Sequence, residues 1–153
     1  MTKQQGMARS AKWTSTVLSV SPLEEDHLSL QAIFGHSTWR LFSADRVSPA
    51  LAFLHRHETS VVLCECDLMP GTWIDMLDNI RHLPQPPSLI VTSRLADESL
   101  WAEALNLGAW DVLAKPFDHT EVIRSVHSAW RHWHDRDELH TNRSKQAMTA
   151  TAA

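Results

Sequence analysis

Val112-Leu113-Ala114-Lys115-Pro116-Phe117 is a short apolar run that closes with Lys-Pro-Phe. A run of this kind suits a strand that is buried on both faces of a sheet. Before it, Gly108 is a natural end for a helix predicted over 97–107, because glycine accepts the left-handed backbone of a helix C-cap. After it, the spacing of Asp118 and Glu121 is typical of a helix start. The segment is therefore predicted to join a strand to the last helix of the chain.

The same alternation of strand and helix continues through the chain. Predicted strands lie at about 17–20, 39–43, 61–64, 89–92 and 111–114, and predicted helices at about 21–34, 48–54, 73–82, 97–107 and 118–139. In the first helix, Ser21 is expected to be the N-cap, Pro22 the first helical residue and Glu24 the acid of a capping box. Each parallel crossover needs a covering element. We therefore expect an α/β fold, a flavodoxin-like doubly wound five-stranded parallel sheet with helices on both faces, with any site at the carboxyl ends of the strands.

Length and composition limit the classes of protein. The 153 residues suit one domain, and a hydrophobic content of 43% with seven Trp suits a globular core. The net charge of −4 argues against a nucleic-acid partner, and no apolar run is long enough to span a membrane. Cys64 and Cys66 lie two apart on a strand, where they do not bridge easily. This favours reduced thiols and a cytoplasmic protein.

Polar, unpatterned sequence marks both ends of the chain. Residues 1–14 and 141–153 are expected to be flexible tails, and 15–140 a single domain with an extended last helix. The start of the chain lacks the apolar region of a signal peptide. No linker leads to a second domain, so the sequence predicts a stand-alone protein without an attached effector domain.

Three segments together resemble the receiver domains of response regulators in two-component signalling. They are residues 60–65 with the Met69-Pro70-Gly71 loop, 89–93 and 108–117, and the resemblance covers about 17–130. In that family, two adjacent acids after strand one help to hold Mg²⁺, and an aspartate that ends strand three accepts the phosphoryl group. A Thr or Ser ends strand four and a Lys ends strand five. An aromatic residue two or three positions before that Lys swings inward on activation.

The resemblance places the acid pair on Ser21 and Pro22, which supply no carboxylate to a hard cation. This loss argues against Mg²⁺ binding, so we expect no cofactor and a receiver of the degenerate, or pseudo-receiver, type. Glu24, Glu25 and Asp26 follow closely. We expect them in the first turn of the first helix, where acids suit the helix dipole; the alternative is that one of them reaches the pocket.

Two adjacent residues are candidates for the phosphoacceptor position. Counting back from Ile80-Arg81 places it on Glu65, whereas counting back from Met69-Pro70-Gly71 places it on Cys66, with Asp67 next. We favour Glu65, because the apolar run ends immediately before it. Its carboxylate reaches one methylene further than that of aspartate, roughly where a phosphoaspartate would place negative charge, and it would face the lysine of the pocket. The alternative is a simple ion pair at the sheet edge.

Thr92, Lys115 and Pro116 match the phosphate pocket of the family. Lys115 would neutralise an anion, and Thr92 would donate its hydroxyl to it. Pro116, usually cis in the family, would turn the chain into the last helix. The switch aromatic is missing, because Val112 takes its position and the chain contains no Tyr. The resemblance therefore does not extend to the coupling that transmits phosphorylation.

Several histidines lie on the last helix, namely His127, His132, His134 and His140. No two of them are one helical turn apart, so no histidine metal site is expected. Trp133 is expected beyond the sheet edge as an exposed interface anchor, with Trp130 beside it and Trp101 on the preceding helix. These residues mark helix four, strand five and helix five as a surface for a homodimer or a partner. The alternative is that the tryptophans only shield the core.

The sequence thus predicts an atypical receiver in phosphorelay signal transduction that acts by protein–protein interaction without normal Mg²⁺-dependent phosphorylation. Its partners would be signalling proteins, such as a histidine kinase or a downstream effector, rather than nucleic acid or membrane. It is not expected to be an enzyme beyond self-phosphotransfer from a phosphodonor. One alternative is a phosphorylatable receiver that uses Asp67 or Glu65 as its acceptor. A weaker one is a small flavodoxin-like protein that binds a nucleotide or flavin, although no glycine-rich phosphate loop follows strand one.

Overall fold

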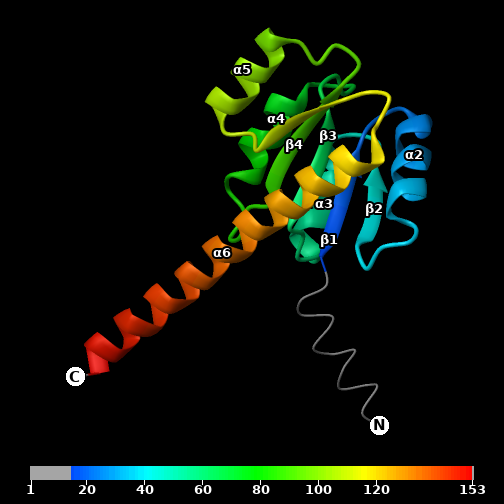
Figure 1. Ribbon diagram of the computed structural model, residues 1–153. Coiled ribbons are helices and arrows are strands. Elements are labelled where there is room, and N and C mark those ends of the chain that lie inside the picture. Colours follow the sequence, from blue (N-terminus) through cyan, green and yellow to red (C-terminus); the bar gives the residue numbers. More distant parts are fainter. Residues whose placement is uncertain (1–14, 153) are drawn as a thin grey trace.

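Strands and helices alternate along the chain (Figure 1). The computed structural model describes residues 15–152, apart from the side chains of His140 and of residues 150–152. The strands are β1 (Thr16–Val20), β2 (Arg40–Ala44), β3 (Val61–Glu65), β4 (Ser88–Ser93) and β5 (Asp111–Ala114). The helices are α2 (Glu24–Phe34), α3 (Val47–Arg56), α4 (Trp73–Ile80), α5 (Glu98–Leu107) and α6 (His119–Ala152). The predicted fold class is confirmed.

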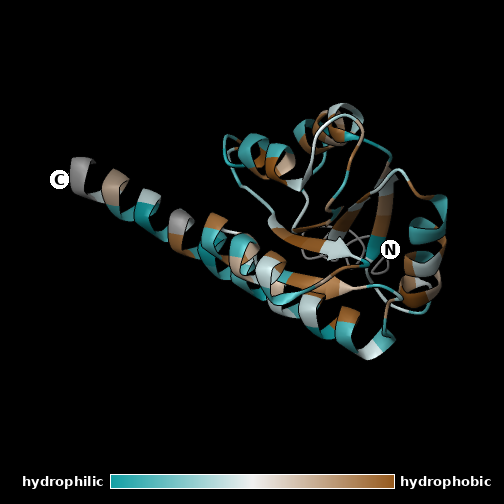
Figure 2. Cartoon of the chain, turned by 90° about the horizontal axis from the view of Figure 1, so that it is seen from above, coloured by the Kyte–Doolittle hydropathy of each residue, from teal (hydrophilic) through white to brown (hydrophobic). Residues whose placement is uncertain are grey.

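The five strands form one parallel sheet in the order β2-β1-β3-β4-β5. α3, α4 and α5 pack on one face, and α2 and α6 pack on the other, each set around its own hydrophobic cluster. Figure 2 shows hydrophobic residues concentrated along the strands between these two layers. β3 and β4 are buried at every position, as their apolar runs predict, whereas the edge strand β2 is largely exposed.

The strand order reverses between β1 and β3, which are neighbours in the sheet. At such a reversal the loops that leave adjacent strands run to opposite faces, which opens a crevice at the carboxyl ends of the strands. Side chains that follow β1, β3, β4 and β5 therefore meet at this edge. The Lys115–Pro116 peptide bond at the end of β5 is cis, as the family resemblance implies.

The first helix begins later than its predicted start. α2 begins at Glu24, and its N-cap residue Leu23 makes no side-chain capping bond. Ser21 and Pro22 lie instead in the link after β1. The Ser21 hydroxyl accepts a hydrogen bond from the Leu23 backbone N–H at 3.1 Å, which closes a local turn. The predicted capping box of Ser21 and Glu24 is therefore wrong.

α6 continues to Ala152, well past its predicted end near Leu139. No Gly or Pro follows Pro116, and the Ala, Lys, Arg and Gln residues of the terminal segment favour helix, so nothing in the sequence stops it. The backbone of 141–152 is therefore helical, which corrects the expectation of a tail from residue 141; the other expected tail, 1–14, lies outside the described residues. Figure 1 shows the second half of α6 projecting away from the sheet.

Within residues 15–152, no helix is both long enough and apolar enough to cross a membrane. α6 has the length but carries charged and polar residues throughout its projecting half, as Figure 2 shows by its mixed colouring.

Candidate functional site

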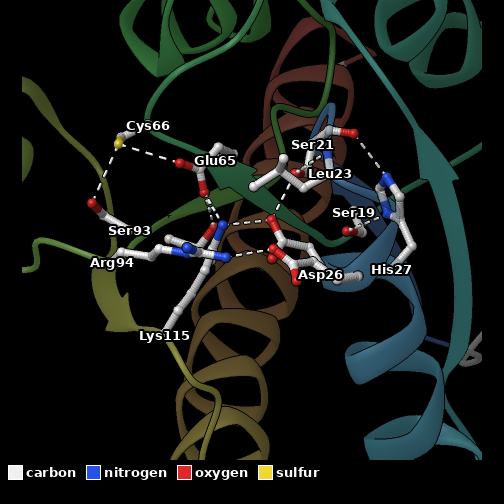
Figure 3. A network of polar contacts seen from close by, with 12 residues as sticks. Ser19, Ser21, Leu23, Asp26, His27, Glu65, Cys66, Ser93, Arg94 and Lys115 are labelled. Atoms are coloured by element: carbon white, nitrogen blue, oxygen red, sulfur yellow. Dashed lines mark hydrogen bonds and ion pairs between the residues drawn. The ribbon is translucent and has the colours of Figure 1, made fainter.

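A lysine lies between two carboxylates at the carboxyl edge of the sheet (Figure 3). Lys115 Nζ donates to Oδ2 of Asp26 at 2.5 Å and also to Oε2 of Glu65. The three side chains are only 6%, 6% and 9% exposed, in that order. Buried charges are costly unless they are paired, so the pairing of these three side chains is part of the folded structure.

Three different elements place these side chains. Glu65 is the last residue of β3, and side chains alternate along a strand, so it shares the α2 and α6 face with Leu63. Lys115 directly follows β5, and its backbone N–H donates to the Ser93 carbonyl at 3.0 Å. Asp26 lies in the first turn of α2 and is turned inward, with 5% of its surface exposed. The predicted contact of Glu65 with Lys115 is thus present.

Asp26 is the one acid of the first helical turn that enters the site. Besides Lys115, its Oδ2 accepts a hydrogen bond from the Ser21 hydroxyl at 2.6 Å. The expectation that all three acids serve only the helix end is therefore wrong, and the alternative that one reaches the pocket is right. Ser21, at an acid-pair position, supplies no carboxylate itself but donates a hydrogen bond to one that comes from the first turn of α2.

His27 is a residue of the site that the sequence interpretation missed. It is 6% exposed, and its Nε2 donates to the Ser21 carbonyl at 2.8 Å. A carbonyl only accepts, so Nε2 carries a proton, while Nδ1 lies within hydrogen-bond distance of the Ser19 hydroxyl, at 3.0 Å. His27 thereby holds the segment between β1 and α2 in place, and from this segment Ser21 donates to Asp26. Its helical spacing from Leu30 and Phe34, both buried, is the signal that could have identified it.

A second polar pair lies on the other face of the sheet edge. Cys66 Sγ is 3.3 Å from Ser93 Oγ and 3.5 Å from Oε1 of Glu65. Burial raises the pKa of the Cys66 thiol to about 11, so the sulfur is protonated at neutral pH. A protonated thiol is a poor nucleophile. Burial also raises the pKa of the neighbouring Cys64 thiol.

The two hydroxyls at the end of β4 point to opposite faces. Thr92 donates to Oε2 of Glu65 across a long 3.5 Å. The strand ends at Ser93, whose side chain alternates with Thr92 and so lies on the face that holds Val112. Of the two, Ser93 therefore shares a face with the switch position. The sequence interpretation assigned the pocket hydroxyl to Thr92 alone and overlooked Ser93.

The donor set offers little to Mg²⁺, which requires a near-octahedral shell of oxygen ligands. The two inward carboxylates already face Lys115, whose ammonium occupies the position between them that a cation would take. Glu65, Cys66 and Asp67 have potential ligand atoms within 4.8 Å of one another. Glu65 is shared with Lys115, and a thiol is a soft ligand, so this trio also suits a hard cation poorly.

An exposed ion pair lies next to the buried cluster. Arg94, just after β4, contacts Oε1 of Glu25 at 2.5 Å, and both side chains are more than 60% exposed. Together with Asp26, Lys115 and Phe117 they line an open cavity of about 620 Å³. Such exposed pairs contribute little to stability because water and salt screen them.

The three tryptophans proposed as interface residues differ in exposure. Trp101 on α5 is 40% exposed, in keeping with the prediction, and the neighbouring Leu105 is 44% exposed. Trp130 is partly buried, with its ring edge-to-face against Trp39 at 6.2 Å between centroids. Trp133 is only 8% exposed, so the prediction of an exposed anchor is wrong for this residue. Together with Pro84, Gln85 and Pro86 of the loop that precedes β4, it lines a small cavity.

Comparisons with known proteins agree with this geometry. The model of the family described as response regulator receiver domain matches residues 25–127. Over 88 residues the chain is 25% identical to the sensory transduction protein LytR of Staphylococcus saprophyticus, which covers 58% of this chain and 34% of that protein. The chain thus spans about a third of the length of that curated relative.

Solved structures share the fold. The signal receiver domain of an HD domain-containing protein from Pseudomonas fluorescens Pf-5 matches with a TM-score of 0.74 and 25% identity, over 82% of this chain and 93% of that chain. The chemotaxis response regulator CheY4 of Vibrio cholerae matches with a TM-score of 0.69 and 14% identity, over 76% of this chain and 98% of that chain. The second likeness concerns the fold alone.

Proposed function

The chain belongs to the response-regulator receiver domain family of two-component signalling, and from that premise we propose that it is an atypical receiver whose acid pocket is closed by its own lysine. One observation carries the proposal: Lys115 is paired with both Asp26 and Glu65 inside the fold. In this proposal the protein acts by binding other signalling proteins, without normal Mg²⁺-dependent phosphorylation. The family match favours this interpretation over a nucleotide- or flavin-binding protein.

The first support comes from the missing metal ligands. Phosphoryl transfer to a carboxylate depends on neutralising the charge that develops on the phosphoryl oxygens, and a metal ion usually does this. Ser21 and Pro22 stand where the acid pair would hold that ion. The remaining acid, Asp26, is engaged by the Ser21 hydroxyl and by Lys115. A fixed internal ammonium therefore replaces an exchangeable cation.

The second support comes from the acceptor position. Glu65 is 7% exposed and already accepts hydrogen bonds from Lys115 and Thr92. A carboxylate nucleophile needs a free oxygen lone pair aimed at an approaching phosphorus. The alternatives are weaker still, because the Cys66 thiol is protonated at neutral pH and Asp67 is exposed, outside the cluster.

Receivers in two-component systems interact with histidine kinases and effectors. For this chain we propose α5 and the turn before it as the contact surface, because Trp101 and Leu105 on the helix and Leu95 in the turn expose apolar side chains. Exposed apolar groups that cluster on one helix are common in protein interfaces. Whether the partner is a second copy or another signalling protein is decided by measuring the mass of the protein in solution, alone and with candidate kinases.

The proposal is tested with Mg²⁺ and acetyl phosphate, which would transfer its phosphoryl group to a carboxylate and release acetate. Intact mass spectrometry is expected to show no added phosphoryl group, while an ordinary receiver treated in parallel gains one. A rapid gain that disappears in Glu65→Gln or Asp67→Asn would overturn the proposal and establish a working phosphoacceptor.

Two restored variants sharpen the test. Both carry Ser21→Asp and Pro22→Asp; one adds Glu65→Asp and the other Cys66→Asp. Gain of a phosphoryl group in one of them alone identifies the acceptor position, because Glu65 and Cys66 face opposite sides of the sheet edge. If neither variant reacts, loss of the acids is not what closes the pocket.

A further inference from the structure

A second set of contacts lies at the opposite, amino edge of the sheet, where the chain passes from α4 to β4. The loop there has the sequence Leu83-Pro84-Gln85-Pro86-Pro87. Proline fixes its own φ angle and pushes the preceding residue towards extended backbone, so this loop has little conformational freedom to lose. Leu83, only 9% exposed, anchors it to the core.

α6 contacts this loop through residues on successive turns. Arg136 Nη2 donates to the Pro86 carbonyl at 2.8 Å, and Gln85 Nε2 donates to Oδ1 of Asp137. One turn earlier, the buried Trp133 lines a cavity of about 210 Å³ together with the same loop. These contacts therefore continue the buried face of α6 beyond the sheet.

That buried face follows the helical repeat and then ends. Its members are Val122, Val126, Ala129 and Trp133, all buried. By contrast, the described side chains of Glu138, Leu139 and residues 141–149 are all exposed. The projecting half of α6 thus has no buried face of its own. An isolated helix of that length is only marginally stable in water, so its order depends on the docked half.

The docked arrangement also contains an unfavourable feature. Nε1 of Trp133 is buried without a hydrogen-bond acceptor among the residues that the structure describes. An unpartnered buried donor is destabilising relative to one that reaches water. The two polar contacts around it, from Gln85 and Arg136, are exposed and therefore individually weak. The polar contacts that align α6 with this loop are thus individually weak.

We propose that residues 83–87 form a releasable brace that sets the direction of the projecting half of α6, residues 138–152, relative to the sheet. With the brace closed, the projecting half and anything bound to it keep one orientation. With the brace open, the helix pivots near Trp133. The inference rests on the amino edge of the sheet and is independent of whether the Lys115 cluster prevents phosphorylation.

The test measures the distance from the domain to the projecting helix in the full chain. Nitroxide labels are placed at Ser99→Cys on α5 and Lys145→Cys on α6, both exposed, with Cys64→Ala and Cys66→Ser to remove the native thiols. Pulsed dipolar spectroscopy is expected to give one narrow distance distribution. Adding Gln85→Ala and Arg136→Ala is expected to broaden it markedly.

Two further variants are matched controls. Arg143→Ala removes an exposed arginine of the projecting half that lies outside the brace, and Arg136→Lys keeps a donor at the brace; both are expected to leave the distribution narrow. The same distribution with and without Gln85 and Arg136 would overturn the proposal, as would a broad distribution in the otherwise unaltered protein. Because both brace side chains are exposed, unfolding is not expected, and a circular dichroism melt of each variant checks this.

Discussion

The two edges of the sheet hold their charged and polar groups in opposite ways. At the carboxyl edge, Asp26, Glu65 and Lys115 are buried and paired with one another. At the amino edge, the contacts of Gln85 and Arg136 are exposed, and the indole donor of Trp133 is buried without an acceptor among the described residues. A receiver that switches by phosphorylation changes first at its carboxyl edge. In this chain the charges of that edge are buried and paired, and the amino edge has the more exposed contacts.

Among the substitutions that test this contrast between the two sheet edges, Lys115→Met is expected to have the largest effect on stability. The substitution leaves two buried carboxylates facing each other, and removal of one partner from a buried ion pair typically destabilises a protein by about 3–5 kcal/mol. We expect a loss of this size in urea unfolding. We also expect millimolar Mg²⁺ to stabilise the variant, because the two carboxylates then face a vacated cation position.

Lys145→Met, at an exposed position of α6, is the matched control, and its stability is expected to stay close to that of the unaltered protein. The unaltered protein itself is expected to unfold at the same urea concentration with and without Mg²⁺. A Lys115→Met variant that loses less than about 1 kcal/mol would show that the carboxyl edge is not held by buried charge.

Next in size is the expected reactivity of Cys66. Its pKa is raised from an ordinary 9.0 to about 11, a difference of two units. Two units correspond to roughly 100-fold less thiolate at neutral pH. Since the thiolate is the reactive form, we expect alkylation by iodoacetamide at pH 7.5 to be slower than that of free cysteine by a factor of that order, and to accelerate with rising pH until about pH 11.

Mass spectrometry of the labelled peptides separates Cys66 from the buried Cys64, and Cys66→Ser is expected to abolish the slow labelling. Alkylation as fast as that of free cysteine would mean that the carboxyl edge opens to solvent. The contrast between the two edges would then be lost.

The sequence was sufficient for the fold and for part of the site. Alternating apolar runs and the Lys-Pro-Phe segment specify the parallel sheet, and strand ends specify which residues share its carboxyl edge. Glu65 and Lys115 were identified from these strand ends together with the resemblance to receiver domains. Asp26 was assigned to the helix end because acids there have a sufficient local reason, the helix dipole. Its inward turn depends on where α2 begins, and helix starts are poorly defined by local sequence.

Trp133 shows the opposite error. Trp133 was expected to lie past the edge of the sheet and therefore to be exposed. It is buried instead, beside the proline loop before β4. A contact between residues 84–86 and residue 133 spans a long sequence separation, and neither segment alone predicts it. The length of α6 was underestimated for a simpler reason, because polar residues were interpreted as a tail although they are good helix formers.

A smaller effect is expected from His27→Leu, which tests how the carboxyl edge is assembled. The substitution preserves an apolar body but leaves the Ser21 carbonyl and the Ser19 hydroxyl without their partner. An unsatisfied buried group costs about 1–3 kcal/mol, so we expect a loss of about 2 kcal/mol in urea unfolding. His36→Leu, at an exposed position just after the same helix, is the matched control and is expected to change little. Equal stabilities of the two variants would mean that His27 does not hold the link to Asp26.

The smallest expected effect concerns Arg94 and Glu25, the ion pair at the surface of the same edge. Both side chains are more than 60% exposed, so their coupling in a double-mutant cycle of Arg94→Ala and Glu25→Ala is expected to be below about 1 kcal/mol. It is also expected to weaken in 1 M salt, because salt screens the attraction between solvent-exposed charges. A coupling above about 2 kcal/mol that persists in salt would contradict this, since exposed pairs do not reach that value. The buried cluster would then extend to the surface, and Arg94 would help to close the pocket. The expected small value confines the fixed part of the carboxyl edge to Asp26, Glu65 and Lys115.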